Sequence, residues 1–288
     1  AAHDRVQAHE WEAYLCTPAP AGAGYMSLTT PADRDAQVEG WDGGLADSEI
    51  AKSVRQLRRR KATRQGSVPA DVWKSSWQST VGDALRRRMQ DIWDDGRIPE
   101  FWTEAEMIPL CKGKAIQGVR NWRLINILPS SGKIFAAAAA TAANFQRGVA
   151  QFGFTEHVGV REAVFVRDRV RQDMEARNQC WAKCAFDVEE AFPTPCLQRM
   201  WQEVQHIPGR AGYARRFLVM NSRAGRARLV APDRVCTMYV SAGVKQGDRA
   251  GPVHFRDIFR DVRGRFSAAL RRNDIHPVLW EVPTAGFS

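Results

Sequence analysis

The chain lacks any run of about 20 apolar residues, the length that an α-helix needs to span a bilayer. Its first residues also lack the charged and apolar segments that direct a protein to secretion. These two absences disfavour a membrane role and a secretory role. We expect an intracellular protein, nuclear or cytoplasmic, with no membrane partner.

Cysteine is scarce as well. The 288 residues include six cysteines, with no CxxC pair and no zinc-finger spacing. Cys180 and Cys184 lie close in sequence, but no His or Cys pair stands near them at ligand spacing, so a metal site there is disfavoured. A chain of this length can bury a core without disulfides. We expect reduced cysteines that are mostly buried.

Acidic residues are too few to balance the basic ones. The chain has 32 Asp and Glu against 42 Lys and Arg, a net charge of +10. Residues 1–50 hold nine acids and two bases, which is −7, so residues 51–288 carry +17. A body this basic predicts a polyanionic partner such as nucleic acid.

The order of secondary structure along the chain indicates the fold class. Residues 1–47 are acidic, and from residue 16 rich in Pro, Gly and Ala, so we expect a disordered or linker-like segment there. The expected helices cover 48–60, 70–95, 130–149, 161–177, 197–205 and 255–270, and the expected strands 104–111, 122–128, 180–188, 226–231 and 234–241. This irregular mixture predicts an α+β protein, with an antiparallel sheet flanked by helices.

Two segments of the second half could carry chemistry. Asp187 follows an expected buried strand, a place where α+β enzymes hold a divalent metal. The loop Gly243–Asp248 has two glycines that let the backbone approach a ligand, and Gln246 offers both a donor and an acceptor. Taken alone, an acid at a strand end is more often a turn residue, and glycine loops are common.

Six segments in a fixed order, however, resemble the reverse transcriptase family, most closely the type carried by non-LTR retrotransposons. The family's W-x-x-G-x-I-P-x-x-W pattern is matched by residues 93–102, its first fingers motif by 108–114, N-Y-R-P-I-S-L-L by 121–128, Q-x-G-F by 151–154, motif A by 186–192 and motif B by 243–255. Any one match is weak, but six in the family's order are unlikely by chance. The resemblance covers most of residues 48–270.

The resemblance implies a right-hand polymerase fold and DNA synthesis on an RNA template by two-metal phosphoryl transfer. Asp187 would ligate both Mg²⁺ (or Mn²⁺) ions, and the carbonyl of Val188 would add an oxygen. Phe192 stands where the family has the aromatic gate that excludes a 2′-hydroxyl. The implied partners are an RNA template, a DNA primer and deoxynucleoside triphosphates.

Four further residues would bind the nucleotide if the resemblance holds. Arg123 and Lys112 would contact the incoming triphosphate, the arginine by bidentate hydrogen bonds to phosphate. Gln246 and Gly247 would line the nucleotide and template surface. Without the motif order, Lys112 and Arg123 would read as an ordinary basic surface.

The chain also departs from the family pattern. Leu124 replaces the proline after the fingers arginine, and Pro193 replaces the acid that follows motif A. The aromatic-x-Asp-Asp hairpin of motif C is missing after motif B, since the only Asp-Asp pair is Asp94-Asp95. We therefore expect a fingers-like region at 48–178 and an incomplete palm at 179–288, without motif C or thumb. The two-metal site is then incomplete, and the chain alone is expected to be inactive.

Two other interpretations remain open. One is a non-catalytic RNA-binding remnant or domesticated domain on the same fold, which needs only a basic surface. The other is an unrelated helical scaffold, which requires the motif order to be accidental. A polymerase needs a second palm carboxylate, and this requirement separates it from both.

Overall fold

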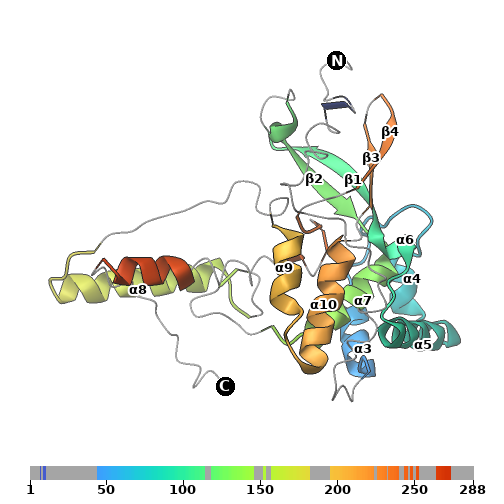
Figure 1. Cartoon of the computed structure of the whole chain (residues 1–288), viewed down its shortest axis with the longest axis horizontal. Helices are drawn as coiled ribbons and strands as arrows, with labels where there is room; N and C mark the ends of the chain where they lie inside the picture. Colours follow the sequence, from blue (N-terminus) through green and yellow to red (C-terminus); the bar gives the residue numbers. More distant parts are fainter. Residues whose placement is uncertain are drawn as a thin grey trace. The chain divides into compact units, whose positions relative to one another are not determined.

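The computed structural model describes residues 7, 9–10, 44–113, 118–145, 152–153, 157–181, 195–223, 226–231, 233–239, 243–245, 247–248, 251–252 and 264–273. These residues form a mixed α and β structure, so the α+β class is confirmed (Figure 1). Contacts divide the chain into two compact units, Ala1–Asn144 with Phe192–Gly251, and Phe145–Ala191 with Pro252–Ser288. The expected division into fingers and palm at residue 178 stays a prediction.

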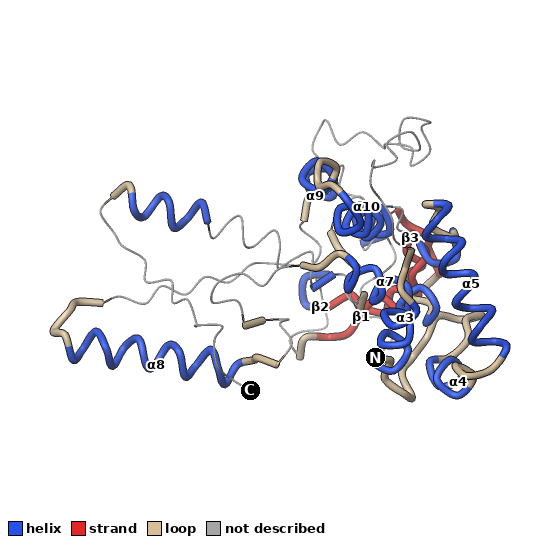
Figure 2. Tube along the Cα trace, turned by 90° about the horizontal axis from the view of Figure 1, so that it is seen from below, coloured by secondary structure: helices blue, strands red, loops and turns tan. Residues whose placement is uncertain are grey.

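The first unit contains most of the described elements. Its helices are α3 (Asp47–Gln56), α4 (Ala70–Ser75), α5 (Thr80–Asp95), α6 (Glu100–Thr103), α7 (Ser130–Ala142), α9 (Leu197–Val204) and α10 (Gly209–Arg223), and η1 (Val119–Asn121) is a short 3-10 helix. Its strands are β1 (Glu104–Cys111), β2 (Trp122–Ile127), β3 (Arg226–Val230) and β4 (Val235–Tyr239). Figure 2 shows these strands in red beside the blue helices.

The four strands form one mixed sheet in the order β2-β1-β3-β4. The pair β3–β4 is antiparallel, which confirms the hairpin expected from residues 226–231 and 234–241, and the pair β1–β2 is antiparallel as well. The central pair β1–β3 is parallel, with Glu104 opposite Arg226, so the expectation of an antiparallel sheet is wrong at this position. The physical reason is the long connection between the two strands, which lets the chain return and run in the same direction.

The two faces of the sheet differ in burial. One face packs on a buried cluster of Met107, Ala227, Leu229, Ala231 and Cys236. The other face is more open to solvent and carries four exposed apolar side chains: Ile108, Leu110, Val230 and Val235. Side chains alternate along a strand, so the register that buries Met107 turns its neighbours outward.

The alanine run of α7 explains how the helices of this unit pack. Ala136, Ala137, Ala138 and Ala139 are all buried, and α7 contacts both α3 and α10 (Figure 1). Alanine has the highest helix propensity and the smallest side chain that still favours a helix, so neighbouring helices can approach closely. The run is therefore a packing surface of the helical core.

An aromatic cluster completes this core. Trp93 is fully buried, and its ring lies 5.0 Å from that of Tyr213 and 6.2 Å from that of Phe217. Phe135 joins them from α7, with its ring centroid 4.7 Å from Phe217. These edge-to-face, stacked and tilted contacts add to the burial of large apolar surface. Residues of α5, α7 and α10 are thereby held in one cluster.

The second unit is described over fewer residues. Its main element is α8 (Val160–Ala176), close to the expected helix at 161–177, and residues 264–271 are also helical. No described side chain of α8 is buried, and Val160 and Phe165 are 80% and 70% exposed. No described helix of either unit is long and apolar enough to cross a membrane.

Several sequence expectations need correction. The helix expected at 70–95 is interrupted at 76–79, where the hydroxyl of Ser79 donates to the carbonyl of Ser76 at 2.7 Å, and the helix expected to reach Val149 ends at Ala142. Asn144 takes a positive φ of 44° there, which stops the helix. The helix α10 was not expected. Of the four described cysteines, Cys236 alone is buried, so the expectation of mostly buried cysteines is wrong for the other three.

Candidate functional site

The hairpin of β1 and β2 brings two of the expected binding residues together. The register pairs Leu110 with Arg123, and the backbone N–H of Lys112 donates to the carbonyl of Asn121, 2.9 Å away. Because side chains alternate, Lys112 and Arg123 emerge from the same face as diagonal neighbours, about 7–8 Å apart at their Cα atoms. This is the open face of the sheet.

Both cations are available to a ligand. Lys112 and Arg123 are exposed, and the Lys112 ammonium donates to the carbonyl of Arg120 at 2.9 Å. Among the described residues, the Arg123 guanidinium has no hydrogen bond or ion pair. Two exposed cations on one face of a rigid hairpin suit an anionic ligand such as phosphate.

The loop Gly243–Asp248 lies against the same hairpin. Gly247 is exposed, with a φ of +117°, and a Cβ added there would stand 2.4 Å from the carbonyl oxygen of Asn126 in β2. Only glycine tolerates both this backbone conformation and this close approach. Asn126 is three residues from Arg123, which is about 10 Å of strand. The structure therefore brings Gly247 and Arg123, which are 124 residues apart in sequence, to one strand.

The loop also meets the segment that follows the expected motif A. The backbone N–H of Gly243 donates to the carbonyl of Pro195, 2.8 Å away. Pro195 is eight residues after Asp187 and three after Phe192. Asp187, Val188, Phe192 and Gln246 themselves lie outside the described residues.

A buried polar cluster supports the loop from beneath. Lys245 is 5% exposed and Asp248 is 4% exposed. The ammonium of Lys245 donates to the carbonyls of Thr103 and Asn221, at 2.9 Å and 3.0 Å. The side-chain amide of Asn221 donates to Asp248 at 3.5 Å. The cluster therefore joins residues that are far apart in sequence: Thr103, Asn221, Lys245 and Asp248.

The electrostatics of this cluster are set by burial and by the charge of Asp248. Burial lowers the pKa of Lys245 to about 8, and the nearby charge of Asp248 partly offsets this effect. Burial also lowers the pKa of Lys133, on α7, and Asp248 opposes that shift too. One carboxylate thus faces two lysines. A carboxylate in such surroundings is a poor ligand for a divalent cation, because the ammonium groups repel the metal.

The metal site that the resemblance implies is not built from the described residues. Within the ranges that the structure describes, no group of three His, Cys, Asp or Glu side chains stands close enough to hold a metal. Asp187 and Val188, the expected ligands, lie outside those ranges.

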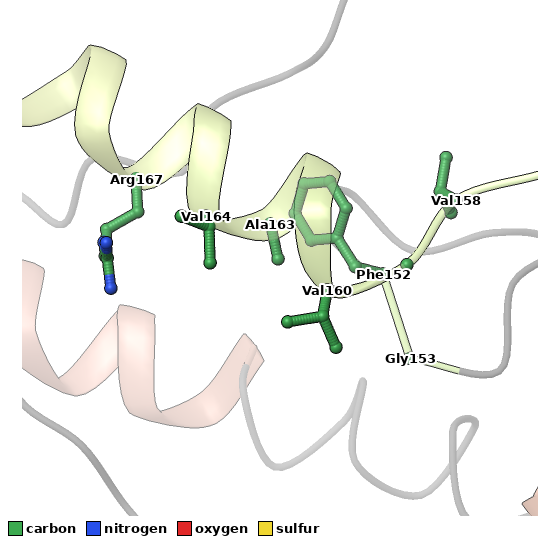
Figure 3. A pocket seen from close by; sticks show the side chains of 8 residues that line it. Phe152, Gly153, Val158, Val160, Ala163, Val164 and Arg167 are labelled. Carbon is green, nitrogen blue, oxygen red and sulfur yellow. The ribbon is translucent and has the colours of Figure 1, made fainter.

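A separate apolar cavity of about 450 Å³ lies at the start of α8, in the second unit. Figure 3 shows Phe152, Val160, Ala163 and Val164 lining it, with Arg167 one turn further along the helix. Phe152 belongs to the segment that resembles the family's Q-x-G-F. The guanidinium of Arg167 is paired with Asp168 at 2.7 Å, so the cavity offers little charge to a ligand.

Comparison with known proteins adds no family to this description. No protein-family model matches the chain, and no curated protein is similar to it. The likeness to reverse transcriptases therefore rests on the six motifs and their order.

Sequence reasoning named the loop but missed what holds it. The motif match includes Lys245 and Asp248 but predicts no role for either residue, although both are buried. A lysine among glycine and valine is the one signal that could have drawn attention to the position. Its partners at Thr103 and Asn221 are 142 and 24 residues away, beyond any local pattern.

Proposed function

We propose that this chain is a reverse transcriptase-like domain that binds an RNA template, a DNA primer and deoxynucleoside triphosphates. The observation that carries the proposal is the contact of Gly247 with β2, the strand that bears Arg123. Gly247, from one motif, therefore contacts the strand that bears Arg123, from a motif 124 positions earlier, and the resemblance assigns both residues to nucleotide binding. If the motif order were accidental, nothing would require these two segments to contact each other.

In this proposal the residues of the hairpin act by charge. Lys112 and Arg123 bind phosphate oxygens, the lysine as a point charge and the arginine through its planar pair of donors. The backbone at Gly247, free of a side chain, lets a base or sugar approach the loop closely. The metal ions of the parent family would supply the charge for phosphoryl transfer when bound.

A non-catalytic RNA-binding domain on the same fold is the second candidate, and the exposed cations Lys112 and Arg123 favour it because they can bind phosphate without a metal. Such a domain keeps the basic hairpin and has no need of a second palm carboxylate. The two candidates differ in one measurable property. A polymerase-type domain binds RNA paired with a DNA primer and responds to the matching nucleotide, whereas an RNA-binding remnant does not distinguish these ligands.

The test is the affinity of the full chain for an RNA template annealed to a DNA primer, measured by fluorescence anisotropy over a range of salt. We expect affinity to fall steeply with salt, since each phosphate contact releases counterions. The double variant Lys112→Ala, Arg123→Ala should bind more weakly and lower the log-log salt slope by about 2. A flat slope in the native chain contradicts the proposal.

A matched control separates specific contacts from net charge. Arg87 is exposed on α5, and Lys61 is exposed in the loop before α4, so Lys61→Ala, Arg87→Ala removes the same two charges elsewhere in the first unit. This control should bind nearly as the native chain does. Equal losses in both double variants would show that general basicity, and not the hairpin, carries the binding.

A further inference from the structure

The ammonium group of Lys245 donates hydrogen bonds to backbone carbonyls at the C-terminal ends of two helices, α6 and α10. Thr103 is the last residue of α6, and Asn221 lies in the last turn of α10. The last four carbonyls of a helix have no partner within the helix, and the negative end of the helix dipole lies there. Lys245 donates to one such carbonyl in each helix, at 2.9 Å and 3.0 Å. It therefore joins two elements that are otherwise far apart in the chain.

The same residue is tied into its own loop. The backbone N–H of Asp248 donates to the carbonyl of Lys245 at 3.0 Å, which closes a turn, and the Asp248 carboxylate faces the ammonium. Asn221 contacts both residues, through its carbonyl to Lys245 and through its amide to Asp248. Hydrogen bonds at Lys245 and at Asp248 therefore hold both ends of the turn that carries Gly247.

A buried lysine is costly, because its charge must leave water. An apolar residue of similar length, such as methionine, would avoid that cost but would leave the two helix carbonyls without a donor. The hydrogen bonds that the ammonium donates therefore explain why a lysine, and not an apolar residue, stands at position 245. What they hold in place is the contact between Gly247 and Asn126, where the space is too small for a Cβ atom.

We propose that Lys245 is the positioning residue of the loop 243–248: by capping α6 and α10 together, it sets where Gly247 lies against β2. The inference rests on the proposed function in one respect, namely that this loop binds the nucleotide. Lys245 itself is buried and does not touch the ligand. It acts through the loop, and small displacements of such a loop weaken binding strongly.

The first experiment is hydrogen exchange of the full chain, read by mass spectrometry over the loop 243–248 and over α5 as the reference. The variants are Lys245→Met, Lys245→Arg and, as a matched control at an exposed lysine, Lys61→Met. We expect Lys245→Met to speed exchange of the loop about 10-fold or more and to leave α5 unchanged. Lys245→Arg keeps the cation and its donors, so it should exchange more slowly than the methionine variant, and Lys61→Met should match the native chain.

A double variant keeps the test decisive if the single change unfolds the chain. Lys245→Met leaves Asp248 buried and without its counter-ion, and Lys245→Met with Asp248→Asn removes that charge. We expect the double variant to stay folded while its loop still exchanges fast. Native-like exchange of the loop in the methionine variants, or an equal rise in the loop and α5 in both, overturns the proposal.

The second experiment measures affinity for the same primer–template. Lys245→Met should weaken binding about 10-fold, and Lys245→Arg should restore most of it. If the native chain does not bind primer–template, the proposed function fails, while hydrogen exchange still decides whether Lys245 positions the loop. If Lys245→Met speeds hydrogen exchange of the loop but leaves the affinity for primer–template unchanged, the position of the loop does not control binding, and that part of the proposal is overturned.

Discussion

The hydroxyl of Tyr213 donates a hydrogen bond to the backbone carbonyl of Trp93, 2.5 Å away and 120 residues earlier in the chain. Trp93 lies in the last turn of α5, so this bond satisfies a carbonyl at the end of that helix. It also fixes α10 against α5 within the aromatic cluster. The contact links the two elements that hold the core of the first unit.

Removing this hydroxyl should cost stability without disturbing the ring packing. We expect Tyr213→Phe to lower the free energy of unfolding by about 1 kcal/mol, the usual net value of one hydrogen bond. Burial raises the pKa of Tyr213 to about 12, above its ordinary value of 10.0. The native chain then keeps a proton that the unfolded chain loses, so the native protein should lose stability as the pH rises from 10 toward 12, and the phenylalanine variant should not. Urea unfolding at pH 7 and at pH 11 checks both parts, and identical pH profiles would contradict the second.

The lowered pKa of Lys245 predicts that the stability of the protein rises with pH over a range that begins near pH 8. Its native pKa of about 8 lies below the ordinary value of 10.5, so between these values the unfolded chain holds a proton that the native chain has lost. Stability should therefore rise with pH from about 8, by about 3 kcal/mol in total if the whole shift is expressed. The pKa of Lys133 is lowered by burial in the same direction and adds to this trend, while the charge of Asp248 opposes both shifts.

The measurement is the free energy of unfolding at pH 7, 8 and 9.5 in the native chain and in Lys245→Met. The native chain should gain stability relative to the variant over this range. A variant that shows the same gain would assign the effect to another group. Working below pH 10 keeps the ionisation of Tyr213 out of the comparison.

Gly247 should not tolerate a side chain. Its φ of +117° is disfavoured for L residues, and the added Cβ would lie 2.4 Å from the Asn126 carbonyl. We expect Gly247→Ala to destabilise the chain by about 2 kcal/mol or more and to weaken primer–template binding. Gly66→Ala is the matched control: its φ is +76°, but no atom lies within 4 Å of the added Cβ, so only backbone strain of about 1 kcal/mol remains. Equal unfolding midpoints in the two variants would show that the contact with β2 is not tight in solution.

Primer extension is expected to be absent. The native chain and Asp187→Ala should both fail to extend a DNA primer on an RNA template, with either Mg²⁺ or Mn²⁺. Two divalent cations a few ångströms apart repel strongly, and the family balances them with carboxylates of motifs A and C, the second of which this sequence lacks. Losing one electrostatic element of such a site commonly costs about 10² to 10³ in rate, and losing motif C should cost more.

An active reverse transcriptase on the same primer–template serves as the positive control for that assay. Extension by the native chain that disappears in Asp187→Ala would contradict the prediction. It would mean that a carboxylate elsewhere in the chain completes the metal site.

Local patterns in the sequence determined much of the secondary structure. The strand at 104–111 and the hairpin at 226–241 were recognised from alternation and turn residues, and α8 from helical periodicity. The motif order likewise singled out Lys112 and Arg123, although only the structure showed that they share one hairpin. These features depend on residues that are neighbours in the chain, so a short stretch of sequence is enough to predict them.

The tertiary structure alone decided the rest. The parallel pairing of β1 with β3 joins Glu104 to Arg226, and no local pattern specifies such a partner. The burial of Lys245 depends on Thr103 and Asn221, which supply the carbonyls that make a buried ammonium tolerable. Desolvation and strand pairing are set by residues distant in sequence, so a motif could point to the loop of Gly247, while only the fold could show what holds it.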